Sequence, residues 1–175
     1  LRLAEYFFSN MHRALINPYK NTSRFKRKYL FTAIALCICL LSRAQPMLMG
    51  STFSGGNEFG LIFQTNLQGN NLKTSHAFEG YSGTFPFYTA LCEAGNGKLY
   101  GLCSQGGNYA HGVLFEFDPA TNAYTKLIDF DGDSLGSNPR GALMRSAGGK
   151  LYGMTNQGGA NNLGVLFEFD PVNKT

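Results

Sequence analysis

The sequence lacks several features that identify common classes of protein. It contains no tryptophan, only four cysteines and no Cys-x-x-Cys pair, so we expect no zinc site, for which only His76 and His111 would remain nearby. No apolar run reaches the roughly 20 residues that a membrane-spanning helix requires. The glycine pairs precede predicted strands rather than helices, so they lack the helix N-terminus of a phosphate-binding loop. No cofactor is expected, apart from a weak calcium candidate considered below.

Positive charge is missing from the second part of the chain. Up to Ala44 there are eight Lys and Arg residues against the single acidic residue Glu5, whereas from Gln45 onward seven basic residues stand against ten acidic ones. A protein that binds nucleic acid keeps its basic residues on the folded part of the chain. We therefore expect no nucleic-acid partner.

The basic first part, residues 1–44, has the organisation of a leader with a secretory signal peptide. Residues 24–28 supply positive charge, residues 29–41 form an apolar segment, and residues 42–44 offer small side chains for cleavage between Ala44 and Gln45. A short membrane anchor or a buried helix is the alternative for the apolar segment. The sequence predicts a secreted or cell-surface protein of bacterial type with no stable membrane span after cleavage.

A unit of about fifty residues occurs three times, which is typical of a repeat architecture. A less regular first copy has Leu48-Met49-Gly50, Gly55-Gly56 and Gly60 followed by Leu-Ile-Phe. We divide residues 45–175 into about two and a half repeats: 48–98, 99–150 and a partial 151–175. The second and third copies agree almost letter for letter and define the pattern: Leu99, Tyr100, Gly101, Gly106, Gly107, Gly112, Phe115, Phe117, Asp118 and Pro119, then Leu151, Tyr152, Gly153, Gly158, Gly159, Gly164, Phe167, Phe169, Asp170 and Pro171.

Each unit is predicted to contain four short strands and no helix. Residues 141–146, 150–155 and 165–169 are such runs, and residues 123–130 supply a fourth strand that needs a bulge. Four strands in about fifty residues are typical of a β-propeller blade. The predicted fold class is therefore all-β, with tandem four-stranded propeller-like blades in an incomplete array and a signal-peptide helix at the N-terminus. Because propellers close with about 4–8 blades, we expect this chain to be the N-terminal piece of a longer protein.

Two cysteines remain after the leader, Cys92 and Cys103. A two-residue turn at Asn96-Gly97 would place Cys92 opposite Gly101, so that both cysteines share a face about 7–8 Å apart. That separation is long for a disulfide. We expect two free thiols, although an oxidising compartment permits a bridge.

Three groups of side chains are candidates for chemistry. Asp129, Asp131 and Asp133 alternate as calcium ligands do, with a solvated acidic connector as the alternative. Glu116 and Glu168 take equivalent positions, and a ring of such carboxylates could serve a glycosidase, although one acidic residue per repeat is more often the solvent face of a strand. Aromatic residues are expected to pack between units or to contact sugar rings or a protein partner: Phe85, Phe87, Tyr88, Tyr100, Tyr109, Tyr124 and Tyr152. His76 and His111 are not predicted to form a nucleophile–base pair.

The repeated letters resemble the GloVer-type tandem repeat over residues 48–171. The resemblance implies an exported or surface protein, and it attaches no common activity to the repeat. The kelch blade is the nearest alternative, since Gly106-Gly107, Phe117-Asp118-Pro119 and Tyr124 occupy kelch positions, although the expected tryptophan is absent. Both resemblances imply propeller blades.

The predicted function is a surface interaction or scaffolding module without evident catalytic activity, whose partner is a protein or carbohydrate at a blade face. The alternative is the N-terminal part of a secreted carbohydrate-active propeller enzyme. An incomplete reading frame without a stable product is a third possibility.

Overall fold

The computed structural model describes residues 46–175. All regular secondary structure in this range is β-strand, which confirms the predicted all-β class. Between Pro46 and Thr175 there is no helix of the length and apolarity needed to cross a membrane. The predicted signal peptide and its cleavage site between Ala44 and Gln45 lie outside the described residues.

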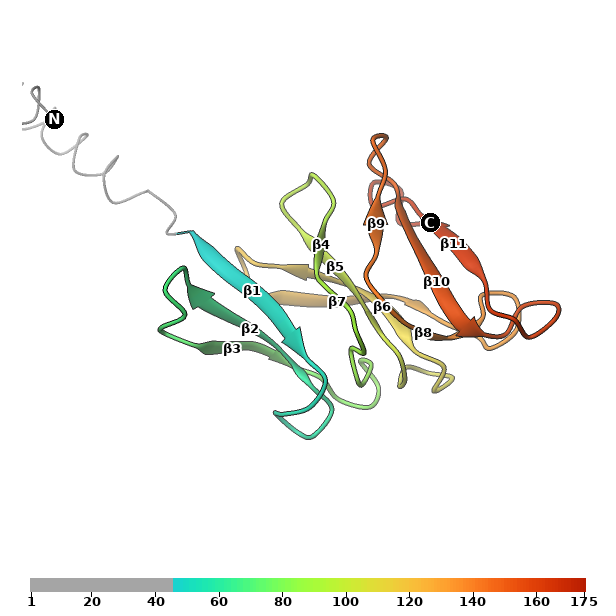
Figure 1. The fold of residues 1–175 in the computed structure, drawn as a ribbon, viewed down its shortest axis with the longest axis horizontal. Helices are drawn as coiled ribbons and strands as arrows, with labels where there is room; N and C mark the ends of the chain where they lie inside the picture. Colours follow the sequence, from blue (N-terminus) through green and yellow to red (C-terminus); the bar gives the residue numbers. More distant parts are fainter. Residues whose placement is uncertain (1–45) are drawn as a thin grey trace, which may run out of the picture. The chain divides into compact units, whose positions relative to one another are not determined.

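The strands form three antiparallel sheets that follow one another along the chain (Figure 1). The first sheet consists of β1 (Met47–Thr52), β2 (Leu61–Asn66) and β3 (Lys73–Ala77). The second sheet has the order β4 (Cys92–Glu93), β5 (Leu99–Cys103), β6 (Val113–Asp118) and β7 (Ala123–Asp129). In the third sheet, β10 pairs on one side with β11 and on the other with both β8 and β9: β8 (Ser137–Pro139), β9 (Met144–Arg145), β10 (Leu151–Gln157) and β11 (Leu166–Phe169).

The predicted strands differ from the observed ones mainly in the segment that leads into each sheet. The strand expected over residues 141–146 is reduced to β9, and β8, which was not predicted, precedes it. The second sheet has only an isolated pair, Thr84 with Gln105, in the place that corresponds to β8. The bulge expected in residues 123–130 is confirmed by a register shift opposite Leu114 and Phe115.

The predicted register of β4 against β5 is wrong by one residue. Cys92 pairs with Tyr100, not with Gly101, because the chain reverses over Ala94 to Lys98 and not in a two-residue turn. A shift of one residue moves a side chain to the other face of a sheet. Cys92 packs in the core between the second and third sheets, whereas Cys103 packs in the core between the first and second. Both cysteines are free, as expected. The reason differs from the expected one, because the two side chains lie on opposite faces of the sheet and not far apart on one face.

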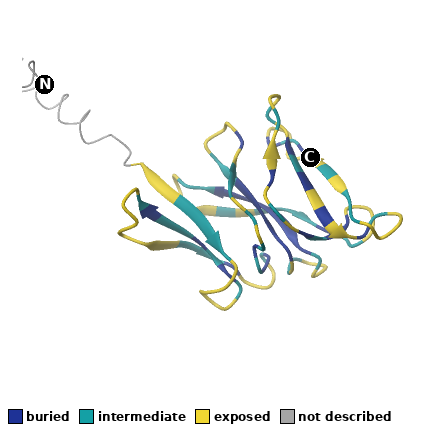
Figure 2. Ribbon diagram, viewed as in Figure 1, coloured by how far each residue is buried: buried dark blue, intermediate teal, exposed yellow. Residues whose placement is uncertain are grey.

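The second sheet is buried on both faces. Along β6, Val113, Phe115 and Phe117 alternate with Leu114 and Glu116, and all five are buried (Figure 2). The first three join Ile62 and Phe78 of the first unit in one core, which we call the first core. Leu114 joins a second core with Leu151 and Phe169 of the third sheet and with Leu143, which precedes β9.

A glycine lies beneath a phenylalanine ring in every sheet. Gly101 pairs across strands with Phe115, and the same pairing joins Gly50 to Phe63 and Gly153 to Phe167. A Cβ atom on Gly101 would stand 2.5 Å from Cζ of Phe115, which is too close for any side chain. The repeated glycine therefore provides space for the ring, and no left-handed backbone is involved.

We expect Gly101→Ala to lower the free energy of unfolding by about 1–3 kcal/mol, because the added methyl group overpacks a buried site. The matched control is Gly148→Ala, where the nearest atom to a new Cβ is Ser146 Oγ at 3.8 Å. Urea unfolding of both variants measures the effect. Equal stability of the two variants would contradict the role given to the ring contact.

Candidate functional site

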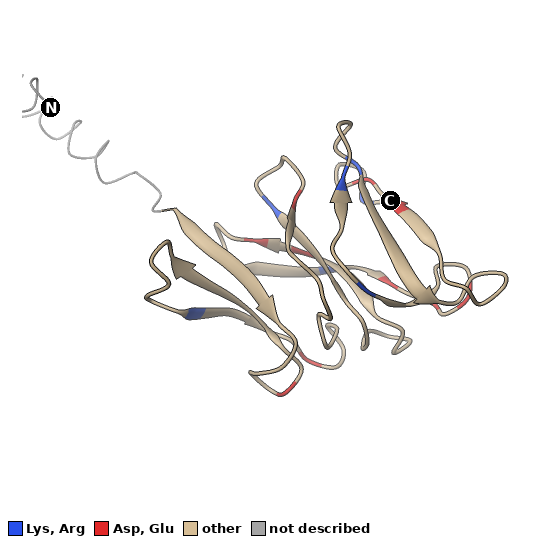
Figure 3. Cartoon of the chain, in the orientation of Figure 1, with Lys and Arg blue, Asp and Glu red and all other residues tan. Residues whose placement is uncertain are grey.

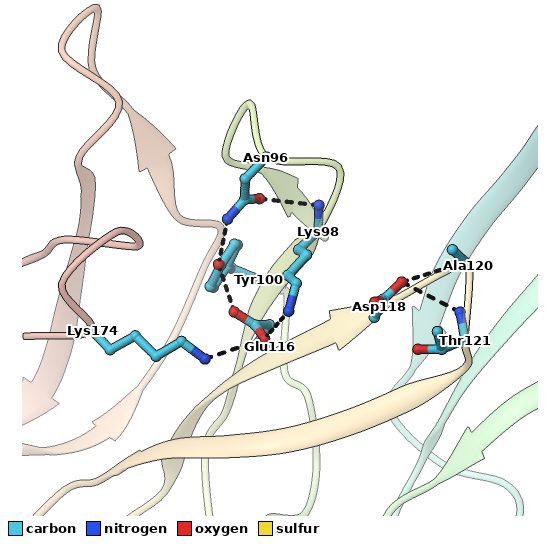
Figure 4. Close-up of polar contacts among 8 residues, drawn as sticks. All are labelled: Asn96, Lys98, Tyr100, Glu116, Asp118, Ala120, Thr121 and Lys174. Atoms are coloured by element: carbon cyan, nitrogen blue, oxygen red, sulfur yellow. Dashed lines mark hydrogen bonds and ion pairs between the residues drawn. The ribbon is translucent and has the colours of Figure 1, made fainter.

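Lys98, Tyr100 and Glu116 form a hydrogen-bonded group, which we call the Lys–Tyr–Glu cluster (Figure 4). Lys98 Nζ donates a hydrogen bond to Glu116 Oε1 at 2.7 Å, and Tyr100 Oη donates one to Glu116 Oε2 at 2.7 Å. Asn96 Nδ2 donates to Tyr100 Oη at 2.9 Å. Tyr100 and Glu116 are directly opposite each other on β5 and β6, so the antiparallel register brings them together.

The same cluster recurs one repeat later. Lys150 and Tyr152 both donate to the carboxylate of Glu168, and Tyr152 pairs with Glu168 across β10 and β11. In the first sheet the corresponding cross-strand pair is Met49 with Gln64, which cannot form the cluster. The cluster therefore belongs to the two regular repeats only.

The two clusters differ in their surroundings. The side chain of Glu116 is 5% exposed, whereas that of Glu168 is 41% exposed. Lys174, from the turn after β11, adds a second cation 3.6 Å from Glu116 Oε1, so the buried cluster bridges two sheets (Figure 4). The expectation of a solvent-facing carboxylate thus holds for Glu168 and is wrong for Glu116.

Burial and hydrogen bonding shift the titration of the buried cluster. Burial alone raises the pKa of Glu116, but hydrogen bonds from Lys98 and Tyr100 outweigh it, and the net pKa is lowered. Burial, together with the negative charge of Glu116, raises the pKa of Tyr100 to about 12. The cluster at neutral pH is thus an ionised carboxylate held by a cation and a neutral phenol.

The carboxylates considered for a glycosidase are occupied by neighbours of their own sheet. Both oxygens of Glu116 and both of Glu168 accept hydrogen bonds from a lysine and a tyrosine. This arrangement joins neighbouring strands and gives each carboxylate two hydrogen-bond donors from its own sheet. It can stabilise a sheet without any bound substrate.

Two of the three aspartates of the calcium candidate have separate partners. Asp129 pairs with Lys126 at 2.9 Å and accepts hydrogen bonds from Asn108. Asp131 caps its own turn by accepting from the backbone of Asp133 and Leu135 and from Ser134. Within residues 46–175 no three acidic, histidine or cysteine side chains gather in a way that could hold a metal ion.

The turn that Asp131 caps contains a Gly-x-Ser-x-Gly sequence at residues 132–136, which sequence reasoning missed. In hydrolases of this pattern the serine stands on a strand-to-helix turn beside a histidine base. Here the turn joins the strands β7 and β8, and Ser134 Oγ donates to Asp131 Oδ2 at 2.6 Å. The serine is thus part of the turn cap.

His76 and the two thiols are packed into the fold. The His76 ring stacks on Tyr124 with centroids 4.0 Å apart, and burial lowers its pKa. Burial also raises the pKa of the Cys92 and Cys103 thiols, which disfavours the reactive thiolate. His111 accepts a backbone hydrogen bond from Asn138 and so helps to join the second and third sheets.

Two of the repeat-defining residues cap equivalent turns. Asp118 Oδ1 accepts hydrogen bonds from the backbone N–H groups of Ala120 and Thr121 (Figure 4). Asp170 accepts from Val172 and Asn173 in the same way. These backbone hydrogen bonds lower the pKa of both aspartates. The Asp-Pro pair of the repeat is thus a turn signal.

Four aromatic side chains form a partly exposed group that we call the aromatic surface: Phe53, Phe85, Phe87 and Tyr88. The ring of Phe53 stacks on that of Phe85, with ring centroids 5.1 Å apart, and meets the Phe87 ring edge-on at a centroid distance of 5.2 Å. The ring centroids of Phe87 and Tyr88 are 4.1 Å apart. Tyr88 is 80% exposed and Phe53 49%. The Arg140 guanidinium lies 5.1 Å from the centre of the Phe87 ring. The surface thus combines open aromatic rings with one cation.

Two residues of the aromatic surface have an unusual backbone. Phe85 and Tyr88 adopt φ values of 53° and 54°. One repeat later the corresponding residues are Asn138 and Gly141, with φ values of 52° and 85°. Bulky residues are rare in this left-handed region, whereas Asn and Gly are common there. The clustered aromatic rings were predicted from the sequence, but their left-handed backbone was not. Aligning residues 84–88 with residues 137–141 would have suggested it, because Asn and Gly stand at the matching positions.

The other predicted aromatics divide into packed and open residues. Tyr100 is fully buried against Phe169, and Tyr124 donates a hydrogen bond to the backbone of Ser82. Tyr109 is 60% exposed and Tyr152 is half-buried. Charged residues of both signs are scattered over the described part of the chain (Figure 3). The aromatic surface is therefore the strongest candidate for contact with a partner.

The Lys–Tyr–Glu cluster gives a stability prediction. We expect Glu116→Gln to lower the free energy of unfolding at pH 7 by about 1–3 kcal/mol, because it removes a buried charge between two lysines. The folded-state pKa of Glu116 is below the unfolded value, so its contribution is present above about pH 4.3 and is lost as the pH falls further. The gap between wild type and variant should therefore shrink in acid.

Urea unfolding between pH 3 and pH 7 measures this gap. Glu168→Gln is the matched control, since the same contacts are exposed there and little change is expected. A gap that stays constant down to pH 3, or equal losses in both variants, would contradict the assignment.

Comparison with known proteins identifies the repeat. A model of the family described as the Gloeobacter/Verrucomicrobia repeat matches residues 37–175, which confirms the resemblance to the GloVer-type repeat. No curated protein and no solved structure matches the chain. With repeated sheets, repeated glycine–phenylalanine pairs and a family match over most of its length, this chain belongs to the Gloeobacter/Verrucomicrobia repeat family.

Proposed function

We propose that this chain is an exported repeat protein that acts as a surface interaction or scaffolding module, with its sheets arranged as propeller-like blades. Its partner is a protein or a carbohydrate, and the aromatic surface is the contact. The proposal depends on one observation, namely that Phe85 and Tyr88 occupy left-handed positions where the next repeat has Asn138 and Gly141.

The left-handed backbone makes these rings costly for the fold. A bulky residue in this region costs about 1–3 kcal/mol, and such strain gathers at binding sites and other functional positions. Packing alone does not account for Tyr88, because its side chain is 80% exposed. An exposed ring in a strained position is what a contact residue requires, since large aromatic side chains dominate binding energy at interfaces.

The polar groups support a non-catalytic role. The carboxylates of Glu116 and Glu168 are each paired with a lysine and a tyrosine. Ser134 caps a turn, and His76 packs against Tyr124. The alternative, the N-terminal part of a secreted carbohydrate-active propeller enzyme, finds no supporting contact among residues 46–175.

Tyr88→Gly should remove binding without lowering the free energy of unfolding. We expect this variant to lose binding to isolated envelopes of the producing cell, because the exposed ring is removed. The unfolding free energy should stay the same or rise by about 1 kcal/mol, because glycine adopts the left-handed backbone without strain. A pull-down on envelopes, with urea unfolding alongside, measures both.

Tyr109→Gly is the matched control for this experiment. Tyr109 is 60% exposed but has no left-handed backbone, so its removal should leave envelope binding unchanged. Equal binding by wild type and Tyr88→Gly would rule out the aromatic surface as the contact.

Export gives a separate prediction. We expect the protein isolated from its producing cell to begin at Gln45, because residues 24–44 read as a signal peptide with a cleavage site after Ala44. N-terminal sequencing of protein from the medium and the cell surface measures this. A first residue within 1–43 would contradict cleavage at that site.

A further inference from the structure

The third sheet has an open apolar face at the positions that are buried in the second sheet. Met154 and Leu166 of the third sheet are 62% and 72% exposed. The equivalent residues one repeat earlier are Leu102 and Leu114, which are 1% and 0% exposed. The two pairs take equivalent cross-strand positions, Met154 on β10 opposite Leu166 on the edge strand β11, and Leu102 on β5 opposite Leu114 on β6.

The edge of this face repeats the same contrast. Met144 on β9 is 65% exposed, while its equivalent Cys92 on β4 packs against the second core. The Lys–Tyr–Glu cluster of the third sheet also faces this side, because Glu168 follows the same alternation as Leu166. We call Met144, Met154, Leu166 and Glu168 the open face.

The structure itself shows what covers such a face. The equivalent face of the second sheet is covered by the third sheet, through Leu143, Leu151 and Phe169. A cation accompanies the apolar side chains, since Lys174 lies 3.6 Å from the buried carboxylate of Glu116. The covering surface is thus one sheet of the same repeat with two leucines, a phenylalanine and a lysine.

We propose that the open face binds another unit of the same repeat, one that presents leucine, phenylalanine and lysine side chains at the positions of Leu151, Phe169 and Lys174. The proposal rests on the scaffolding function proposed above. Burial of three large apolar side chains and a second cation for Glu168 would supply the association free energy. The first sheet of a second copy fits this face less well, because it has Thr65 and Asn70 where the third sheet has Phe169 and Lys174.

The test extends the full chain after Thr175 with a second copy of residues 124–175. This extension keeps the repeat in phase, because Thr175 corresponds to Ala123. The copies of Met144 and Met154 in the extension are replaced by leucine, so that oxidation reports only on the original face. Peptide mass spectrometry then follows methionine oxidation by hydrogen peroxide in the original and extended chains.

We expect oxidation of Met154 to slow at least tenfold in the extended chain and that of Met144 to slow as well. Met47, which is 48% exposed on the first sheet, should be oxidised at the same rate in both chains. A second extended chain carries Glu in place of the appended copy of Phe169, and it should lose the protection. Absorbance titration offers an independent readout. The hydrogen bond to Glu168 already raises the pKa of Tyr152, and burial in the extended chain should raise this pKa further, as burial does for Tyr100.

Two results would overturn the proposal. One is unchanged oxidation of Met154 while circular dichroism shows added strand structure, because the appended unit then folds without using the face. The other is an appended unit that stays unfolded, because the open face then does not support a neighbouring sheet. Neither result touches the aromatic surface, so the envelope-binding experiment with Tyr88→Gly judges the proposed function separately.

Discussion

The structure depends on strands that are buried on both faces. An alternating strand of a single sheet ordinarily turns one face to the core and one to water. In β6 the residues that alternate with Val113, Phe115 and Phe117 are buried as well, in a second core. The second sheet thus supplies half of each of two cores, and the neighbouring sheets supply the other halves. A single repeat has no complete core of its own, as expected for repeat architectures.

The buried polar cluster fits this arrangement. A buried carboxylate is tolerated only where its hydrogen bonds are satisfied, and Glu116 obtains them from Lys98 and Tyr100 of its own sheet before the third sheet adds Lys174. The same three residue types in the third sheet are stable while exposed. The same three residues of the repeat can therefore be buried in one unit and exposed in the next without leaving the glutamate carboxylate unpaired.

The strands could largely be predicted from the alternation of residue types, but which of their faces is covered by a neighbouring sheet could not. The alternation of Val165, Phe167 and Phe169 predicted a strand with one buried face, which is what β11 has. The letters of Leu114 and Leu166 are the same, yet one is buried and the other exposed, because burial depends on the next sheet and not on the strand itself. The error at Cys92 came from the length of one turn, since a shift of one residue reverses the face.

The candidate site was predictable in composition and not in conformation. Phe85, Phe87 and Tyr88 stand out in the sequence as clustered aromatics. Their left-handed backbone does not, because residue preferences favour the opposite conformation for bulky side chains. Likewise, the spacing of Asp129, Asp131 and Asp133 suggested a shared ligand, whereas the fold gives Asp129 to a lysine and Asp131 to its own turn.

The placement of the two cysteines has a consequence for how the protein matures. Cys92 and Cys103 belong to different cores on opposite sides of one sheet, so no bond can join them without taking the sheet apart. The fold of residues 46–175 therefore requires no disulfide bond. Reduction removes no cross-link from residues 46–175.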